Sequence, residues 1–112
     1  MTSEVFNVVR QINVHELKAM LEGNERLQLW DVRTDAERRI AVIPGARHLD
    51  QQGVEELDDL DRETLLVFHC HHGIRSQAAA EYFAAKGFTN LCNVTGGIEA
   101  WSVQIDPAVP RY

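Results

Sequence analysis

The feature that most constrains the fold of this chain is an apolar run that leads directly into a short polar stretch and then into a helical pattern. The run is Leu65–Phe68, the polar stretch is Cys70–Arg75, and the helical pattern extends from Arg75 to Lys86. An unbroken apolar run of this kind is typical of a strand that is buried on both faces of a sheet. The sequence therefore predicts a central strand over Thr64–His69 that turns through a tight loop into a helix.

Short apolar runs alternate with helical patterns along the rest of the chain, which is typical of α/β proteins. Two capping-box pairs mark helix starts, Asn13 with Glu16 and Thr34 with Glu37. The other expected segments are strands at 27–30, near 46–48 and at 91–94, and helices at about 54–60 and after residue 97. Four to five short strands separated by helices predict one α/β domain over residues 1–112. Its central sheet is expected to be mainly parallel, with about five strands and helices on both faces.

Composition and charge narrow the classes of partner. The 112 residues include 11 basic and 17 acidic side chains, which gives a net charge of −6. This balance argues against nucleic acid or an anionic membrane as a partner. It also requires that an anionic substrate be attracted locally, at the loop, and not by the protein as a whole.

The location and redox state of the chain are expected to be those of a cytoplasmic protein. No apolar run approaches the roughly 20 residues that cross a membrane, and the N-terminus shows no signal-peptide pattern. The two cysteines, Cys70 and Cys92, are far apart in sequence and do not form a disulfide framework. We expect both to be reduced, with Cys92 as a core residue of its strand.

Cys70 is the candidate nucleophile. A cysteine between a strand end and a helix N-terminus is close to backbone N–H groups and to the positive end of the helix dipole, which favour the thiolate. The alternative is a small buried apolar residue, but the surrounding loop is polar. The run His69–His72 does not predict a metal site, because four adjacent residues cannot all converge on one ion. No cofactor is expected.

Four segments in order resemble the rhodanese homology domain, specifically the single-domain sulfurtransferases. They are Asp31-Val32-Arg33, Ile43-Pro44-Gly45-Ala46, the loop Cys70-His71-His72-Gly73-Ile74-Arg75-Ser76, and Gly96-Gly97 followed by Ala100-Trp101. The resemblance covers nearly the whole chain. One departure is visible, because many members have Gly-His before the Ile-Pro-Gly segment, where this chain has Ala41-Val42.

The resemblance implies that the thiolate of Cys70 takes sulfur from thiosulfate or a persulfide such as glutathione persulfide, and passes it to cyanide, a thiol or an acceptor protein. It implies a donor site made by the residues that follow Cys70, namely His71, His72, Gly73, Ile74, Arg75 and Ser76. Loop N–H groups would stabilise the anionic persulfide. Arg75 would hold the sulfonate end of thiosulfate, since a cation at a helix start is disfavoured unless it has an anionic partner.

Two assignments stay open at this point. His71 and His72 either attract anions when protonated or are solvated residues whose backbone alone matters, and the second is favoured. Asp31 and Arg33 are expected to form an ion pair that supports the loop, and the alternative is a plain surface pair.

Two other functions fit parts of the pattern. Phosphatases and arsenate reductases of the cysteine-loop type have a loop one residue longer, Cys-x5-Arg, whereas this chain has Cys-x4-Arg. Rhodanese-like interaction modules typically lack the cysteine, which is present here.

Overall fold

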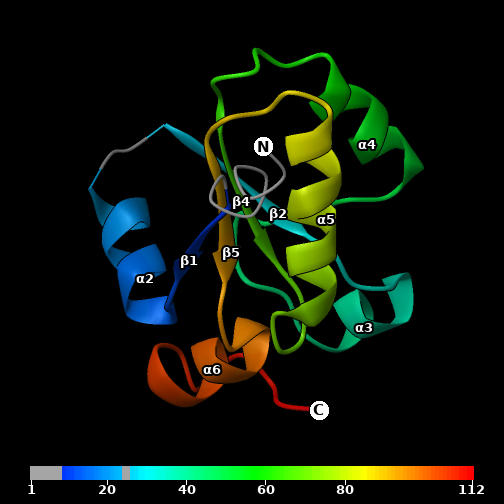
Figure 1. Cartoon of the computed structure of the whole chain (residues 1–112). Helices are drawn as coiled ribbons and strands as arrows, with labels where there is room; N and C mark the ends of the chain where they lie inside the picture. The colour runs from blue at the N-terminus through cyan, green and yellow to red at the C-terminus, as the bar shows by residue number, and fades with distance from the viewer. Residues whose placement is uncertain (1–8, 24–25) are drawn as a thin grey trace.

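The computed structural model describes residues 9–23 and 26–112. Within them, five parallel strands form one sheet in the order β1-β5-β4-β2-β3 (Figure 1). The strands are β1 (Val9–Ile12), β2 (Leu27–Asp31), β3 (Arg47–His48), β4 (Leu65–His69) and β5 (Leu91–Val94). The predicted fold class, an α/β domain around a parallel sheet, is confirmed.

The described helices are α2 (Val14–Glu22), α3 (Asp35–Ile40), α4 (Gln51–Asp58), α5 (Ile74–Ala85) and α6 (Gly97–Gln104). Both predicted capping boxes are present, at the starts of α2 and α3. The predicted start of α4 is wrong by three residues, because Asp50 accepts a hydrogen bond from the Gly53 N–H at 2.8 Å and caps the helix earlier. None of these helices is long and apolar enough to cross a membrane.

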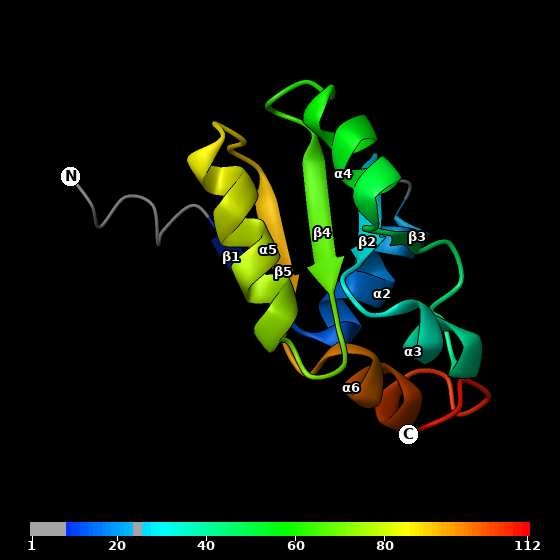
Figure 2. The same cartoon turned by 90° about the vertical axis from the view of Figure 1, so that its right-hand side faces the viewer.

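The core lies on both faces of the sheet, because alternate residues of β4 point to opposite sides. Leu65 and Val67 pack with α2 and α6, whereas Leu66 and Phe68 pack with α4 and α5. Figure 2 shows α4 and α5 in front of the sheet and α2 behind it. This double cover explains why the sequence of β4 is a continuous apolar run with no polar alternation.

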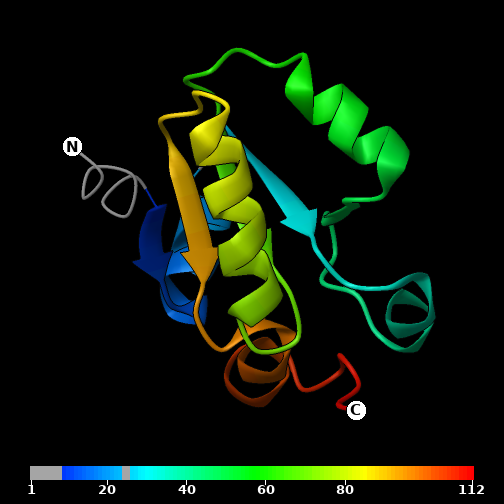
Figure 3. The same ribbon diagram turned by 45° about the vertical axis from the view of Figure 1, so that its right-hand side comes forward.

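The carboxyl ends of β4 and β5 lie side by side, and each leads into a helix at this edge. Figure 3 shows α5 along the front of the sheet and α6 below the strand ends. The first turn of α6 binds the loop that follows β4, because the N–H of Ile98 donates to the Cys70 carbonyl at 2.9 Å and that of Glu99 to the His71 carbonyl at 3.2 Å. A side chain at Gly97 would overlap the Cys70 carbonyl oxygen, so only glycine permits this contact.

Candidate active site

The Cys70 side chain is surrounded by hydrogen-bond donors at the junction of β4 and α5. Its Sγ accepts hydrogen bonds from the backbone N–H of Gly73 at 3.1 Å and of Ser76 at 3.4 Å. The Ser76 hydroxyl is 3.3 Å from the same atom. Cys70 itself is only 1% exposed, so the loop surrounds the sulfur closely.

This environment favours the thiolate of Cys70. Burial by itself raises the pKa of the thiol, but the contact with the Ser76 hydroxyl and the backbone N–H groups of Ser76, Gly73 and His72 outweigh it, so the pKa is lowered from its ordinary value. The predicted placement at a strand end before a helix start is confirmed. The chemistry expected of that placement, nucleophilic attack by a thiolate, is available to this side chain.

Gly73 makes the tight loop possible. Its φ of +107° lies in the left-handed region, and a Cβ there would be 3.1 Å from the Val94 carbonyl oxygen. Its N–H donates to the sulfur, and α5 begins at the next residue. Glycine is therefore required for backbone geometry and not merely for a generic turn.

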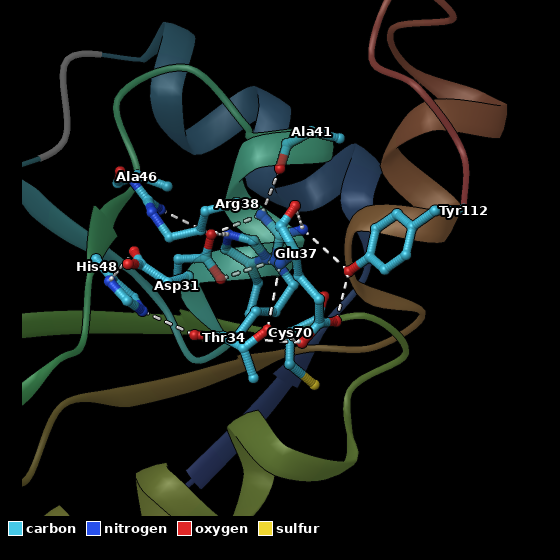
Figure 4. Close-up of polar contacts among 12 residues, drawn as sticks. Asp31, Thr34, Glu37, Arg38, Ala41, Ala46, His48, Cys70 and Tyr112 are labelled. Carbon is cyan, nitrogen blue, oxygen red and sulfur yellow. Dashed lines mark hydrogen bonds and ion pairs between the residues drawn. The ribbon is translucent and has the colours of Figure 1, made fainter.

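Asp31 and Arg33 form a buried pair at the end of β2. Nε of Arg33 donates to Oδ1 of Asp31 at 2.9 Å and Nη2 to Oδ2 at 2.7 Å, and both side chains are inaccessible to solvent. Arg38 adds a third bond to the Asp31 carboxylate at 2.8 Å (Figure 4). Burial raises the pKa of Asp31, but the arginine bonds and the nearby His69 lower it below its usual range. The alternative of a plain surface pair does not describe this geometry.

Arg75 forms an ion pair with Glu37 of the same chain. Its guanidinium donates to both carboxylate oxygens of Glu37, at 2.7 and 2.9 Å. This contact raises the pKa of Arg75 and holds the pKa of Glu37 well below its usual range. The sequence marked Glu37 only as a capping residue of α3, and no local signal paired it with a residue 38 positions away.

Tyr112 was not predicted as a site residue, yet it lies against the loop. Its hydroxyl donates to Glu37 at 2.7 Å and accepts from Nη1 of Arg33 at 3.0 Å. In Figure 4 a dashed line joins this hydroxyl to the carboxylate of Glu37. The ring stacks on His71, with centroids 4.0 Å apart, and His71 stacks in turn on His72 at 3.9 Å.

His71 is therefore a packed side chain and does not extend freely into solvent. Burial, with the neighbouring His72, lowers its pKa. His72 is exposed, as a solvated loop residue would be. Whether either ring contributes to donor binding stays a prediction.

The comparisons with known proteins agree with this arrangement. The sequence profile of the rhodanese-like domain matches residues 13–104. The chain belongs to the rhodanese-like domain family. This match spans every described helix and strand except β1, so the rhodanese-like domain contains the Cys70 loop, the buried Asp31–Arg33 pair and the α6 contact.

Two curated relatives of this rhodanese-like domain carry sulfurtransferase names. The putative sulfurtransferase YtwF of Bacillus subtilis is 35% identical over 100 residues, which is 88% of this chain and 96% of that protein. Thiosulfate sulfurtransferase GlpE of Pseudomonas putida is 42% identical over 84 residues, with 72% of this chain and 74% of that protein covered. A rhodanese-like domain protein of Staphylococcus aureus has a solved structure that matches with a TM-score of 0.74 and 30% identity, over 92% of this chain and 98% of that one. These relatives support a rhodanese-type, sulfurtransferase function in general.

Two further expectations concern Ile74, a residue of the predicted donor site, and Cys92, which was expected to be a core residue. Ile74 contributes backbone to the loop, while its side chain is 81% exposed. Cys92, the expected core residue, is buried in β5, and neither it nor Cys70 is part of a disulfide. Among residues 9–23 and 26–112, no three His, Cys, Asp or Glu side chains are grouped so that they could hold a metal ion.

Proposed function

We propose that this protein is a sulfurtransferase that carries sulfane sulfur as a persulfide on Cys70. The observation that carries the proposal is the environment of the Cys70 sulfur, which accepts hydrogen bonds from the N–H groups of Gly73 and Ser76 at the start of α5. Donors in this arrangement stabilise an anionic sulfur before and after transfer. Family membership and the names of the relatives support the same reaction class.

The reaction has two half-steps. In the first, the Cys70 thiolate attacks the outer sulfur of thiosulfate, a new S–S bond forms, and the old S–S bond breaks so that sulfite leaves with its electron pair. In the second, the thiolate or cyanide acceptor attacks the terminal sulfur, and Cys70 leaves as the thiolate. No net oxidation occurs, and the covalent intermediate predicts ping-pong kinetics.

The donor proposed is thiosulfate or a persulfide such as glutathione persulfide, and the acceptor is cyanide, a thiol or a sulfur-acceptor protein. Residues 71–76 form the donor site in this proposal. Arg75 would exchange Glu37 for the sulfonate of thiosulfate, since its side chain is 44% exposed and within reach of a solute. The net charge of −6 supports the absence of nucleic acid and anionic membrane among the partners, and we propose a cytoplasmic location.

The test is to map the persulfide after exposure to each donor. Mass spectrometry of the Cys70 peptide should show the added mass of one sulfur atom in the wild-type protein and in Cys92→Ser, and none in Cys70→Ser. The two serine variants form a matched pair, because both thiols are buried and the Cys70 sulfur is the one that lies at the start of α5, where it accepts a hydrogen bond from Gly73. Sulfur found on Cys92 would overturn the assignment. Phosphatase turnover of a generic phosphoester by the wild-type protein would favour the cysteine-loop phosphatase alternative.

A further inference from the structure

A chain of side-chain hydrogen bonds leads from the Cys70 sulfur to the surface. The Ser76 hydroxyl lies 3.3 Å from Sγ of Cys70 and donates to Oδ1 of Asn93 on β5 at 2.6 Å. The amide nitrogen of Asn93 then donates to the Gly73 carbonyl at 3.1 Å and to Oε1 of Gln11 on β1 at 2.9 Å. Ser76 is 0% exposed and Asn93 3%, so water does not replace these partners.

The orientation of the Asn93 amide is fixed by chemistry. The backbone carbonyl of Gly73 can only accept, so the group that faces it must be the amide nitrogen of Asn93. The opposite atom, Oδ1, therefore faces Ser76, and Oδ1 can only accept. It follows that the single hydrogen of the Ser76 hydroxyl is directed toward Asn93 and not toward Cys70.

One hydroxyl hydrogen cannot serve two acceptors fully. The protonated thiol can donate to the free lone pair of the Ser76 oxygen, so it is compatible with the Ser76–Asn93 bond. The thiolate has no hydrogen to donate, and it competes with Oδ1 of Asn93 for the hydroxyl. If the hydroxyl turns to the sulfur, a buried amide oxygen loses its partner, which is unfavourable.

We propose that Asn93 is a positioning residue that holds the Ser76 hydroxyl in the orientation suited to the protonated Cys70 thiol, and so limits how readily the thiolate forms. The inference rests on the proposed role of Cys70 as the reactive thiol, but not on any donor or acceptor. Asn93 makes no hydrogen bond to the sulfur itself among the described contacts, and it acts through Ser76.

The charged and titratable groups around the loop come from several elements and stay unchanged in the test variants. They are His69 at the end of β4, His71 and His72 in the loop, Arg75 on α5, Glu37 on α3, Glu99 on α6, and Tyr112. A shift in the titration of Cys70 in these variants therefore reports on the hydroxyl and not on a changed charge.

The test is the pH dependence of Cys70 alkylation by iodoacetamide, followed on the Cys70 peptide by mass spectrometry. Asn93→Leu removes the competing acceptor at similar volume and frees the Ser76 hydroxyl for the thiolate. We expect the apparent pKa of Cys70 to fall by about 0.5–1 unit, which makes alkylation roughly three- to tenfold faster well below that pKa. A merely structural role predicts the opposite sign, because loosening the loop around Gly73 would remove N–H donors from the sulfur and raise the pKa.

Three controls make the result decisive. Ser76→Ala/Asn93→Leu should titrate like Ser76→Ala alone, since Asn93 acts only through the hydroxyl. Gln11→Leu should leave the titration unchanged, because the Gly73 carbonyl still orients the amide. Asn93→Ala tests the same point if the leucine variant does not fold. An unchanged or raised pKa of Cys70 in folded Asn93 variants would overturn the inference. Alkylation measures this pKa even if no sulfur donor forms a persulfide on Cys70.

Discussion

At the scale of single residues, the charge of Arg75 is the property that, in the proposed function, decides which sulfur donors the loop takes. Its guanidinium is bound by both oxygens of Glu37, so a dianionic donor has to displace a carboxylate that is already well placed. Glu37 is also held by the Tyr112 hydroxyl and by the Thr34 cap. The loop thus contains a cation suited to sulfonate, and next to it an internal competitor for that cation.

We predict that Arg75→Ala lowers kcat/KM for thiosulfate by roughly 10- to 150-fold, the effect of losing one charge-assisted hydrogen bond. The persulfide of an uncharged thiol should lose far less, because it presents no sulfonate. The measurement is initial-rate kinetics with both donors and a common acceptor. Equal losses for the two donors would show that Arg75 acts only by tethering α5 to α3.

Glu37→Gln provides the complementary variant. Glutamine keeps the capping box of α3, because its side-chain oxygen can still accept from the Thr34 N–H, while the competing charge is removed. We predict a severalfold gain in kcat/KM for thiosulfate and little change for the persulfide that presents no sulfonate. A loss with thiosulfate would mean that the Glu37–Arg75 pair itself is needed to shape the site.

At the scale of elements, the parts that sequence predicts well are those whose determinants are local. The apolar run of β4, the turn glycine Gly73 and the two capping boxes each lie within a few residues of the structure they specify. The strand β1 was not predicted, because only Val9 and Ile12 of its four residues are buried and its pairing with β5 is distant in sequence.

The length of the loop between β4 and α5 sets the size of the nest of hydrogen-bond donors around the Cys70 sulfur. Inserting one glycine between Gly73 and Ile74 should widen the nest, since it separates the Gly73 N–H from the Ser76 N–H that now both reach one sulfur. We predict a sharp loss of thiosulfate–cyanide transfer. Weak phosphate or arsenate binding should accompany it, because a larger anion needs a wider ring of donors.

Two variants that keep the loop length serve as controls for the insertion. His71→Ala removes the stack on Tyr112, and His72→Ala removes an exposed ring. Both should retain much more transfer activity than the insertion in the same assay. If the insertion stays active while either alanine variant is inactive, then side chains and not loop length define the site.

At the scale of the whole molecule, the site is assembled from segments that only the fold brings together. Tyr112 reaches Glu37 across 75 positions, and Ser76 meets Asn93 because α5 packs beside β5. The sequence predicted Cys70 and its loop, but not these partners, since no short pattern encodes a contact between distant elements. The buried Asp31–Arg33 pair was predicted as a pair because its members are two residues apart, whereas its burial depends on the elements packed around it.

His69 makes this buried network sensitive to acid. Burial lowers the pKa of His69 to about 4 from 6.5, although the nearby Asp31 raises it. Below pH 6.5 His69 therefore binds a proton in the unfolded chain but stays neutral in the folded protein. The free energy of unfolding consequently falls as pH drops from 6.5 to about 4. The loss of unfolding free energy from His69 amounts to roughly 3 kcal/mol, and it does not increase further below the folded-state pKa. Asp31, whose pKa is also lowered, acts in a separate and more acidic range, where its stabilisation is lost as pH falls from 3.8 through the folded-state pKa.

We predict that His69→Gln flattens the fall in stability between pH 7 and pH 4.5, because glutamine has no proton to take up. The measurement is urea unfolding of the wild-type protein and the variant at both pH values. The variant should lose stability at pH 7, where the neutral histidine packs well, and recover most of the difference at pH 4.5. His15→Gln, on the exposed face of α2, controls for the loss of a histidine as such. If wild type and His69→Gln lose the same free energy of unfolding between the two pH values, the neutral buried histidine does not control this acid response, and it must be assigned to the carboxylates that titrate at lower pH.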